Sequence, residues 1–182
     1  MPERRSSIQE ELKQRRPFRS KREELFLALL RTAAVVKRPV SKVMEEGGVS
    51  LAQYNVLRIL RGAGATGLPT LAIRERMIEE AAGITRLIDK LEAAGFVRRD
   101  RANLADRRQV YCQVTDEGLA LLTRLDPGVL EAIEAALGML DDPAMATLLD
   151  LMDEIRAPGV AAGLVESRAG EETGVTNGLD GA

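Results

Sequence analysis

The sequence has no histidine and no tryptophan, and aromatic residues make up only 3% of its 182 residues. Histidine is the side chain that enzymes most often use as a general base, and it is also the commonest metal ligand. The chain shows neither a glycine-rich loop that could cradle phosphate nor a nucleophile elbow. We therefore expect a protein that is not an enzyme and that holds no metal and no organic cofactor.

Cysteine is almost absent as well, because Cys112 is the single example in the chain. An internal disulfide is therefore impossible, and a reducing cytoplasm is the natural setting. Cys112 alternates with Val110 and Val114, which places all three side chains on one face of a strand. This pattern predicts a small buried hydrophobic residue. A redox sensor that works through Cys112 is the alternative.

Long hydrophobic runs are also missing. The longest apolar candidate, residues 25–36, is interrupted by Arg31 and ends at Lys37, whereas a membrane span needs about 18 apolar residues. Residues 1–24 contain no apolar core of the kind found in a secretion signal. These features predict a cytoplasmic protein with no membrane as a partner.

Composition divides the chain into a basic start, a central domain and a polar end, although the net charge is only -2. Residues 1–22 predict a flexible basic arm, which could add nonspecific contacts to phosphate. Residues 158–182 are rich in Gly, Ala and Glu and predict a disordered tail. We place a single domain at residues 23–157. The cations of the arm are Arg4, Arg5, Lys13, Arg15, Arg16, Arg19, Lys21 and Arg22.

The first half of the domain predicts three helices. A long helix over residues 21–46 carries more apolar side chains than a small domain needs, and Pro39 is expected to kink or split it. The second helix opens with Ser50 and Gln53 at the spacing of a capping box and ends at a glycine-rich turn over residues 62–67. A short third helix runs from Pro69, as a first-turn residue, to about Met77.

The end of the domain is also helical. Thr115 is the expected N-cap of a helix that stops at Pro127 and resumes beyond it. A last helix starts at Asp142 and is expected to bury its apolar stripe. Together with the long first helix, these segments predict a homodimer built from both ends of the chain; an intramolecular three-helix layer is the alternative. The stripe of the last helix consists of Met145, Leu148, Leu149, Met152 and Ile155.

An amphipathic helix precedes Gly95. Apolar residues at i, i+3, i+4 and i+7 predict one buried stripe, and small or polar side chains on the remaining surface suit insertion into a DNA groove. An ordinary solvated helix face is the alternative. The stripe is Ile84, Leu87, Ile88 and Leu91, and the other face carries Ala82, Thr85, Arg86, Asp89, Lys90 and Ala93.

A basic β-hairpin follows this helix at once, and the pair can place one element in the major groove and the other against the backbone or minor groove. Its local excess of positive charge suggests a footprint on phosphate. The alternative is a solvated hairpin with internal pairs, in which Asp106 holds a neighbouring arginine. The hairpin carries Arg98, Arg99, Arg101, Arg107 and Arg108 against Asp100 and Asp106.

The chain resembles the MarR family of winged helix-turn-helix regulators from about Leu25 to Ile155. The resemblance is strongest in TRLIDKLEAAGFVRR and DRRQVYCQVTDEG. It depends on three ordered matches at family-like spacing: a turn at the end of the recognition helix, a wing motif, and the start of the next helix. These matches are Leu91, Glu92 and Gly95; Asp106, Arg107 and Arg108; and Val114, Thr115 and Gly118.

The resemblance implies a mainly α fold with a small β-hairpin, in which a winged helix-turn-helix domain lies between N- and C-terminal dimerisation helices. Its DNA-binding lobe is expected at about residues 50–115. It implies a homodimeric repressor that leaves a palindromic operator when a small lipophilic or aromatic effector binds. The long first helix, the Tyr54 helix and the Leu119 helix are expected to wall the effector pocket. A winged-helix protein-interaction module that reads no DNA is the competing class.

We expect the contacts with double-stranded DNA to come from the recognition helix and the wing. One departure from the family pattern is the acidic entry to the recognition helix, where Glu79 and Glu80 stand in place of capping residues. We expect these acids to complement the helix dipole and to face solvent. The expected DNA-binding residues are Ala82, Gly83, Thr85, Arg86, Lys90, Arg101, Asn103, Asp106, Arg107 and Arg108.

Overall fold

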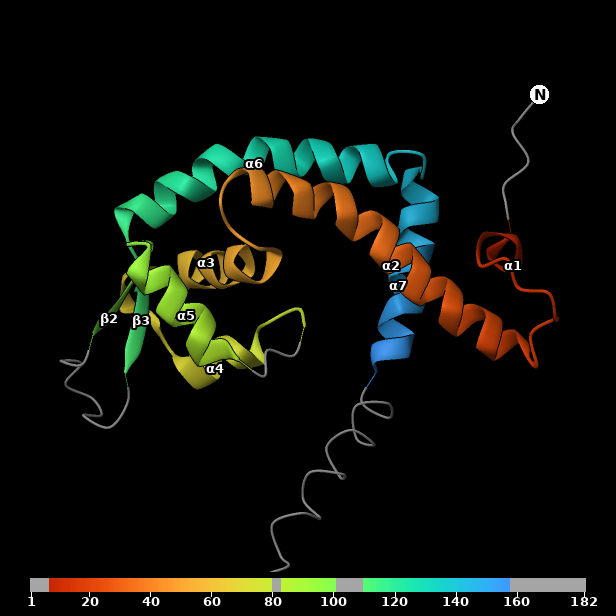
Figure 1. Ribbon diagram of the computed structural model, residues 1–182, viewed down its shortest axis with the longest axis horizontal. Helices are drawn as coiled ribbons and strands as arrows, with labels where there is room; N and C mark the ends of the chain where they lie inside the picture. Colours follow the sequence, from red (N-terminus) through yellow and green to blue (C-terminus); the bar gives the residue numbers. More distant parts are fainter. Residues whose placement is uncertain (1–6, 80–82, 101–109, 158–182) are drawn as a thin grey trace, which may run out of the picture. The chain divides into compact units, whose positions relative to one another are not determined.

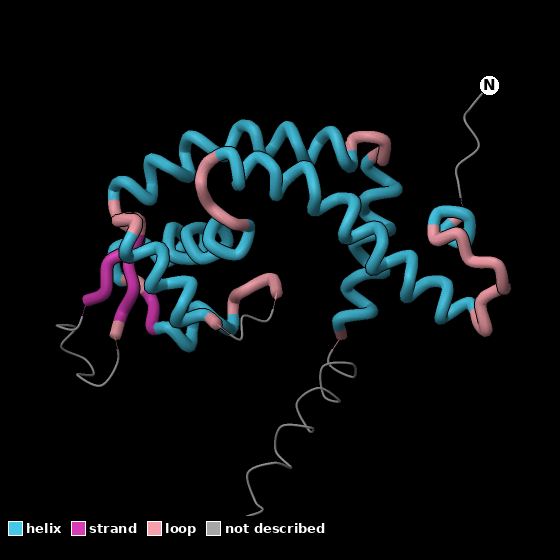
Figure 2. Tube along the Cα trace, in the orientation of Figure 1, coloured by secondary structure: helices cyan, strands magenta, loops and turns pink. Residues whose placement is uncertain are grey.

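The computed structural model describes residues 7–79, 83–100 and 110–157. The chain divides into two compact units, Met1–Leu137 and Gly138–Ala182, which are considered separately. Figures 1 and 2 show the predominance of helices. In chain order the elements are α1 (Ile8–Glu11), α2 (Lys21–Glu46), α3 (Leu51–Ala63), the 3-10 helix η1 (Gly64–Thr66), β1 (Leu68–Pro69), α4 (Thr70–Glu75), α5 (Ile84–Ala93), β2 (Val97–Asp100), β3 (Tyr111–Val114), α6 (Asp116–Leu137) and α7 (Asp142–Arg156).

The core of the first unit lies where α3, α5 and α6 meet the sheet. Leu57, Leu60, Ile88, Leu91 and Leu122 are fully buried there. The capping box of Ser50 and Gln53 begins α3 as expected, with each side chain bonded to the backbone of the other residue. The expected cap of α6 is also present, because the Gly118 N–H donates to Thr115 Oγ1 at 3.1 Å.

Both long helices continue through a proline, so the expected break at Pro127 is wrong and Pro39 does not split α2. A proline removes one helical hydrogen bond, which frees the carbonyl four residues earlier. The residues concerned, Val35 and Thr123, are exposed, so water can bond these carbonyls. The packing of α2 against α6 supports both helices (Figure 1).

The sheet contains a strand that the sequence analysis missed. Its order is β1-β3-β2 and all pairs are antiparallel, with Leu68 opposite Cys112 and Val97 opposite Val114. Pro69 therefore lies in β1 and occupies the N-cap position of α4 instead of lying in its first turn. Gly67 lies directly before β1 and has a φ of +64°. A Cβ at this position would lie 2.4 Å from the Cys112 carbonyl oxygen. Only glycine allows this close approach.

Residues 7–22, part of the segment expected to form a flexible basic arm, contain a short helix. Ser7 and Glu10 form a capping box around α1, although this helix has only one turn. Arg31 of α2 also pairs with Glu11 at 3.3 Å, which ties α1 to the long helix. The local cap and this distant ion pair together hold a segment whose composition alone indicates disorder.

Helix α7 differs from the expectation that it buries its apolar stripe. Asp141 caps it, with its side chain accepting a hydrogen bond from the Ala144 N–H at 3.0 Å. No residue of α7 is buried, and Leu149 is 59% exposed. Within the described part of the second unit, its apolar side chains are therefore left largely uncovered. None of the helices described here has the length and apolar character needed to cross a membrane.

Candidate nucleic-acid interface

Helix α5 has the amphipathic arrangement that its sequence predicts. Ile84, Ile88 and Leu91 are buried in the core, whereas Thr85, Arg86 and Lys90 are exposed. The structure thus brings three of the expected DNA-binding side chains onto one short helix. Among the residues that the structure describes, neither Arg86 nor Lys90 forms an ion pair or a side-chain hydrogen bond. Both cations are available to an anionic partner.

The turn before α5 is held by two contacts with distant helices. Asn55 of α3 is only 8% exposed, and its Oδ1 accepts a hydrogen bond from the Ile78 N–H at 3.0 Å. Lys37 of α2 forms an ion pair with Glu79. Sequence reasoning missed Asn55; the available signal was a polar residue between Tyr54 and Val56 in a helix that is otherwise apolar there. We expected Glu79 to complement the dipole of α5, but its charge is paired with Lys37 of α2.

The start of α5 has no side-chain cap. Gly83 occupies the N-cap position with φ -121°, and a Cβ there would meet nothing within 4 Å. Gly83 therefore lies where α5 begins, and its part in DNA binding stays a prediction. Ala82 and Glu80 lie outside the described residues.

The prediction that Arg99 belongs to the phosphate-binding charges is wrong. Its guanidinium bonds Asp89 at 2.6 Å and also pairs with Glu92, both on α5. Partial burial disfavours the charge, but the hydrogen bonds that Arg99 donates to Asp89 and Glu92 outweigh this cost and raise the pKa of Arg99. The side chain is only 18% exposed. Arg99 therefore fastens the recognition helix to the hairpin.

The two hairpin strands, β2 and β3, continue away from the pairing between Arg99 and α5. Arg98 donates to Gln113 Oε1 at 2.8 Å across the strand pair, and Asp100 lies opposite Tyr111 at the last described rung. The loop between these strands is residues 101–110, of which residues 101–109 lie outside the described part of the chain. The expected contacts of Arg101, Asn103, Asp106, Arg107 and Arg108 lie in that loop and remain predictions.

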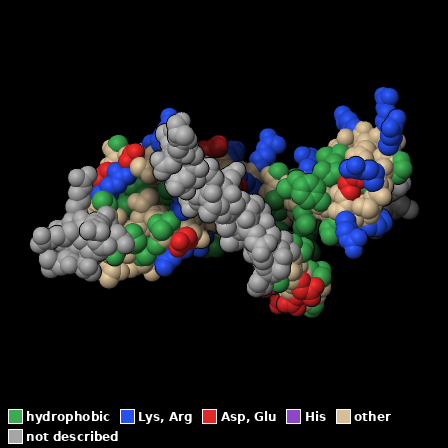
Figure 3. Space-filling view, turned by 90° about the horizontal axis from the view of Figure 1, so that it is seen from below, with side chains coloured by type: hydrophobic (Ala, Val, Ile, Leu, Met, Phe, Trp, Pro, Cys, Tyr) green, Lys and Arg blue, Asp and Glu red, His purple; other side chains and the backbone are tan. Residues whose placement is uncertain are grey.

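A second group of cations lies at the N-terminal end of the first unit. Figure 3 shows Lys and Arg side chains gathered there, around α1 and the start of α2. Arg19 pairs with Glu23 and Lys21 pairs with Glu24, which neutralises part of the group. Lys13, Arg15, Arg16 and Arg22 are exposed and have no ion pair with another described residue.

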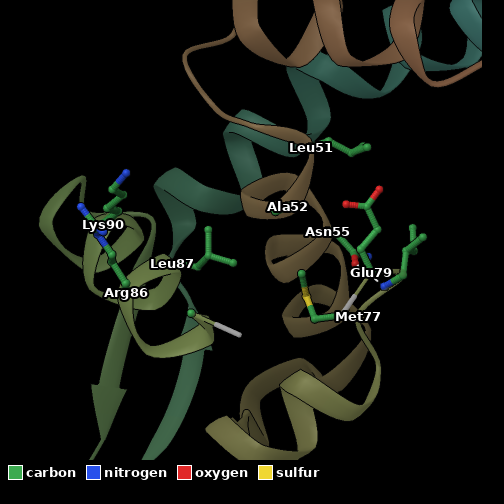
Figure 4. A pocket seen from close by; sticks show the side chains of 10 residues that line it. Leu51, Ala52, Asn55, Met77, Glu79, Arg86, Leu87 and Lys90 are labelled. Carbon is green, nitrogen blue, oxygen red and sulfur yellow. Dashed lines mark hydrogen bonds between the residues drawn. The ribbon is translucent and has the colours of Figure 1, made fainter. Parts of the chain in front are cut away.

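Tyr54 joins α3, one of the three helices expected to wall an effector pocket, to α6. Its hydroxyl donates to Asp126 Oδ1 at 2.8 Å, and Arg61 bonds the other carboxylate oxygen at 2.7 Å. Burial, and then the hydrogen bond with Asp126, raises the pKa of Tyr54 to about 12. The structure does show a groove at another place, between α3 and α5 (Figure 4).

Cys112 is buried as expected. It lies on β3 opposite Leu68 and Arg99, and burial raises the pKa of its thiol. A thiol with a raised pKa is a poor nucleophile at neutral pH, because the thiolate is the reactive species. This environment disfavours a redox sensor.

The arrangement of α4, the turn and α5, followed directly by β2 and β3, defines a winged helix-turn-helix protein. Residues 49–110 match the family model described as the MarR family. A solved MarR transcription factor from Planctomyces limnophilus is 37% identical, with a TM-score of 0.58, over 75% of this chain and 98% of that one. This chain belongs to the MarR family.

Two further comparisons agree with this assignment. The HTH-type transcriptional regulator PecS of Dickeya dadantii is 34% identical over 99 residues, which cover 53% of this chain and 58% of PecS. The chain thus matches little more than half the length of PecS. Sco3205 of Streptomyces coelicolor, a MarR family regulator solved in complex with DNA, has a TM-score of 0.68 at 21% identity, over 76% of this chain and 92% of that one. This last similarity shows the shared fold.

Proposed function

We propose that this protein is a sequence-specific DNA-binding transcriptional regulator that acts on double-stranded DNA. The single observation that carries the proposal is that α5 has one buried apolar face and one exposed polar face. Ile84, Ile88 and Leu91 of its apolar stripe are buried, while Arg86 and Lys90, which pair with no other described residue, face solvent beside Thr85. Arginine can donate two hydrogen bonds to guanine, and lysine acts as a point charge toward phosphate. Helix α5 therefore enters the major groove with Arg86 reading bases.

The wing extends this interface to the neighbouring minor groove. Arg101, Asn103, Arg107 and Arg108 contact phosphate and the groove, and Asp106 orients a neighbouring arginine. Ala82 and Gly83 allow the start of α5 to approach the DNA backbone closely. The fastening of Arg99 to Asp89 and Glu92 supports this proposal, because it keeps the hairpin and α5 in a constant relation.

The active form is a homodimer. In α2, Leu25, Phe26 and Leu30 are more than half exposed, and α6 exposes Leu130. The α7 helix of the second unit leaves its own apolar side chains exposed. Exposed apolar patches of this kind mark interaction surfaces in soluble proteins. A two-fold dimer presents two copies of α5 to the half-sites of a palindromic operator.

Repression with release by a small effector is the regulatory mode that we propose for this dimer. A repressor needs a site where ligand binding opposes DNA binding, and the groove beside α5 is a candidate for such a site. A regulator of chromosomal DNA works in the cytoplasm, so we place the protein there.

Selection from a pool of random duplexes tests DNA reading. We expect the full-length protein to enrich an inverted repeat with half-sites about one helical turn, roughly 10 bp, apart. The Arg58→Ala variant is the matched control, because Arg58 is an exposed arginine on α3 that does not line the groove. It should enrich the same sequence. Failure of the wild-type protein to bind any duplex at low salt would favour a protein-interaction module.

Sedimentation equilibrium tests the dimer separately. We expect the wild-type protein to sediment as a dimer and the Leu25→Glu, Phe26→Glu double variant to shift toward monomer, because two charges would enter the apolar interface. The Leu71→Glu variant is the control, since Leu71 is 55% exposed on α4 and lies outside α2, α6 and α7. A wild-type monomer at micromolar concentration would contradict the proposal.

A further inference from the structure

The N-terminal end of the first unit carries a group of cations that the proposed contacts of α5 and the wing do not use. Residues 12–22 contain six cations and no acidic residue. Four of these cations are exposed and form no ion pair with another described residue. We call these four the basic patch: Lys13, Arg15, Arg16 and Arg22.

The acidic residues on either side of the basic patch are engaged with other groups. Glu10 accepts a hydrogen bond from the Ser7 N–H at 2.9 Å, within the capping box of α1. Each of the other three acids forms an ion pair with a cation outside the patch. The positive charge of the patch is therefore not neutralised by these neighbours. The three pairs are Glu11 with Arg31 at 3.3 Å, Glu23 with Arg19 at 2.7 Å and Glu24 with Lys21 at 2.7 Å.

The basic patch belongs to a folded segment. Gln9 Nε2 donates to the Gln14 carbonyl oxygen at 3.3 Å, which closes the turn after α1. Ser20 caps the start of α2. These contacts fix both ends of the short connection that carries Arg15 and Arg16. A partner that binds there orders less of the chain than one that binds a flexible tail, so less conformational entropy is lost on binding.

The basic patch is separate from the recognition helix. Lys37 of α2 pairs with Glu79 in the turn before α5. Lys21, at the start of α2, lies 16 residues before Lys37, which is a separation of about 24 Å along the helix. A contact at the patch therefore lies outside the groove that α5 of the same protomer occupies.

Double-stranded DNA is the partner that fits such a patch. Its phosphates supply one negative charge per about 1.7 Å of duplex, so several cations can each meet a phosphate. Contacts with phosphate position a protein on DNA and carry no direct sequence information. Single-stranded nucleic acid fits less well, because its bases stack on aromatic side chains. Phe18 is the only aromatic residue among residues 12–22, and it is half-buried.

We propose that the basic patch is a second, sequence-independent contact with double-stranded DNA. It binds phosphates outside the major groove that α5 of the same protomer reads. The inference rests on the proposed function, since α5 must bring the duplex to the protein. The patch raises the affinity for every duplex and adds no discrimination between sequences.

The test compares the full-length Arg15→Gln, Arg16→Gln double variant with the wild-type protein. Fluorescence anisotropy measures the affinities for the selected operator and for a scrambled duplex of equal length over a series of salt concentrations. Each lost phosphate contact lowers the slope of log affinity against log salt by about 0.9, so we expect a decrease of about 2 for each bound protomer. At roughly 0.1 M salt, both affinities should fall by the same factor, about tenfold or more.

The matched control is the Arg58→Gln, Arg124→Gln double variant. It also removes two exposed arginines, one from α3 and one from α6. It should keep the wild-type salt slope and both affinities. If the patch variant does not fold, as judged by circular dichroism, Arg15→Gln and Arg16→Gln alone should each give about half the change in slope.

The outcomes separate this inference from the proposed function. A wild-type salt slope in the patch variant, with operator and scrambled duplex still distinguished, overturns the inference and leaves the proposed function intact. Loss of discrimination in the patch variant also overturns it, because the patch would then affect base reading. If the wild-type protein binds both duplexes equally and the patch variant binds both more weakly, the patch remains a DNA contact and the proposed function is wrong.

Two other partners for the basic patch give different results. Vesicles that contain phosphatidylserine test an anionic membrane surface. If the patch variant loses vesicle binding but keeps the wild-type salt slope for DNA, the patch serves a membrane and the inference is wrong. Sedimentation equilibrium tests a second copy of the chain. A shift of the patch variant toward monomer would assign the patch to the dimer and would equally overturn the inference.

Discussion

Arg99 of β2 bonds Asp89 of α5 at 2.6 Å, so the first strand of the wing is fastened to the exposed side of the recognition helix. Glu92, one helical turn further on, pairs with the same guanidinium. Because Arg99 is paired with these two carboxylates, it is not available to bind a DNA phosphate. It sets the relation between the two elements that we propose meet neighbouring grooves of one duplex.

Replacing Arg99 should therefore destabilise the fold more than replacing its neighbour. We expect Arg99→Ala to lower the free energy of unfolding by about 1–2 kcal/mol, because two carboxylates lose a partly buried partner. Arg98→Ala should change it by less than about 0.5 kcal/mol, since Arg98 is exposed and donates to the neutral Gln113. Urea unfolding of both variants measures the difference, and equal effects would show that the fastening is unimportant.

Tyr54 should ionise at a higher pH than an ordinary tyrosine. Its pKa is raised from 10.0 to about 12, mainly by burial and then by the hydrogen bond with Asp126. The folded state thus prefers the neutral phenol, and this contribution to stability is complete below pH 10 and lost as the pH rises toward 12. The difference in tyrosinate absorbance between wild type and Tyr54→Phe measures the titration. Ionisation of Tyr54 near pH 10, while circular dichroism still shows a folded protein, would refute this.

Cys112 should be unreactive in the folded protein. The thiol is buried and its pKa is raised by that burial, so little thiolate exists near pH 7. We expect a thiol-reactive disulfide reagent to modify Cys112 only as fast as the protein opens, and rapidly in urea. Peroxide should also leave the affinity of the protein for duplex DNA unchanged. A peroxide response that disappears in Cys112→Ser would instead establish the redox sensor.

Gly118 should tolerate no side chain. A Cβ there would lie 2.4 Å from the Phe96 carbonyl oxygen and 2.8 Å from Val114 Cγ2. Gly118→Ala must push α6 away from the hairpin, and we expect a loss of about 1–3 kcal/mol in thermal or urea unfolding. Gly62→Ala is the control, because Gly62 lies in α3 with nothing within 4 Å. It should gain about 0.5–1 kcal/mol, and similar behaviour of the two variants would contradict the steric argument.

The sequence was sufficient to predict α5 and the cap of α6. Spacing alone identifies a stripe such as Ile84, Ile88 and Leu91, because a helix repeats every 3.6 residues. The cap at Thr115 is equally local. Both features involve residues within a few positions of one another, so the pattern in the chain contains the information that determines them.

Contacts between distant segments could not be predicted in this way. Strand β1 has only two residues and exists because β3 pairs with it. Asn55 bonds a backbone group 23 positions away, and Arg99 finds its carboxylates on another element. The continuity of α6 through Pro127 is another case, because packing against α2 overrides a local breaker. Of the expected site, α5 could be placed from sequence, but the partners of its charges could not.

The most direct test of the account is the affinity of Arg86→Ala for the selected operator and for a scrambled duplex of equal length, measured by fluorescence anisotropy. If Arg86 reads a base, the variant should lose about 1–3 kcal/mol of discrimination between the two duplexes. Arg58→Ala should keep the full discrimination. If Arg86→Ala distinguishes the operator as well as the wild-type protein does, α5 does not read DNA in the manner proposed.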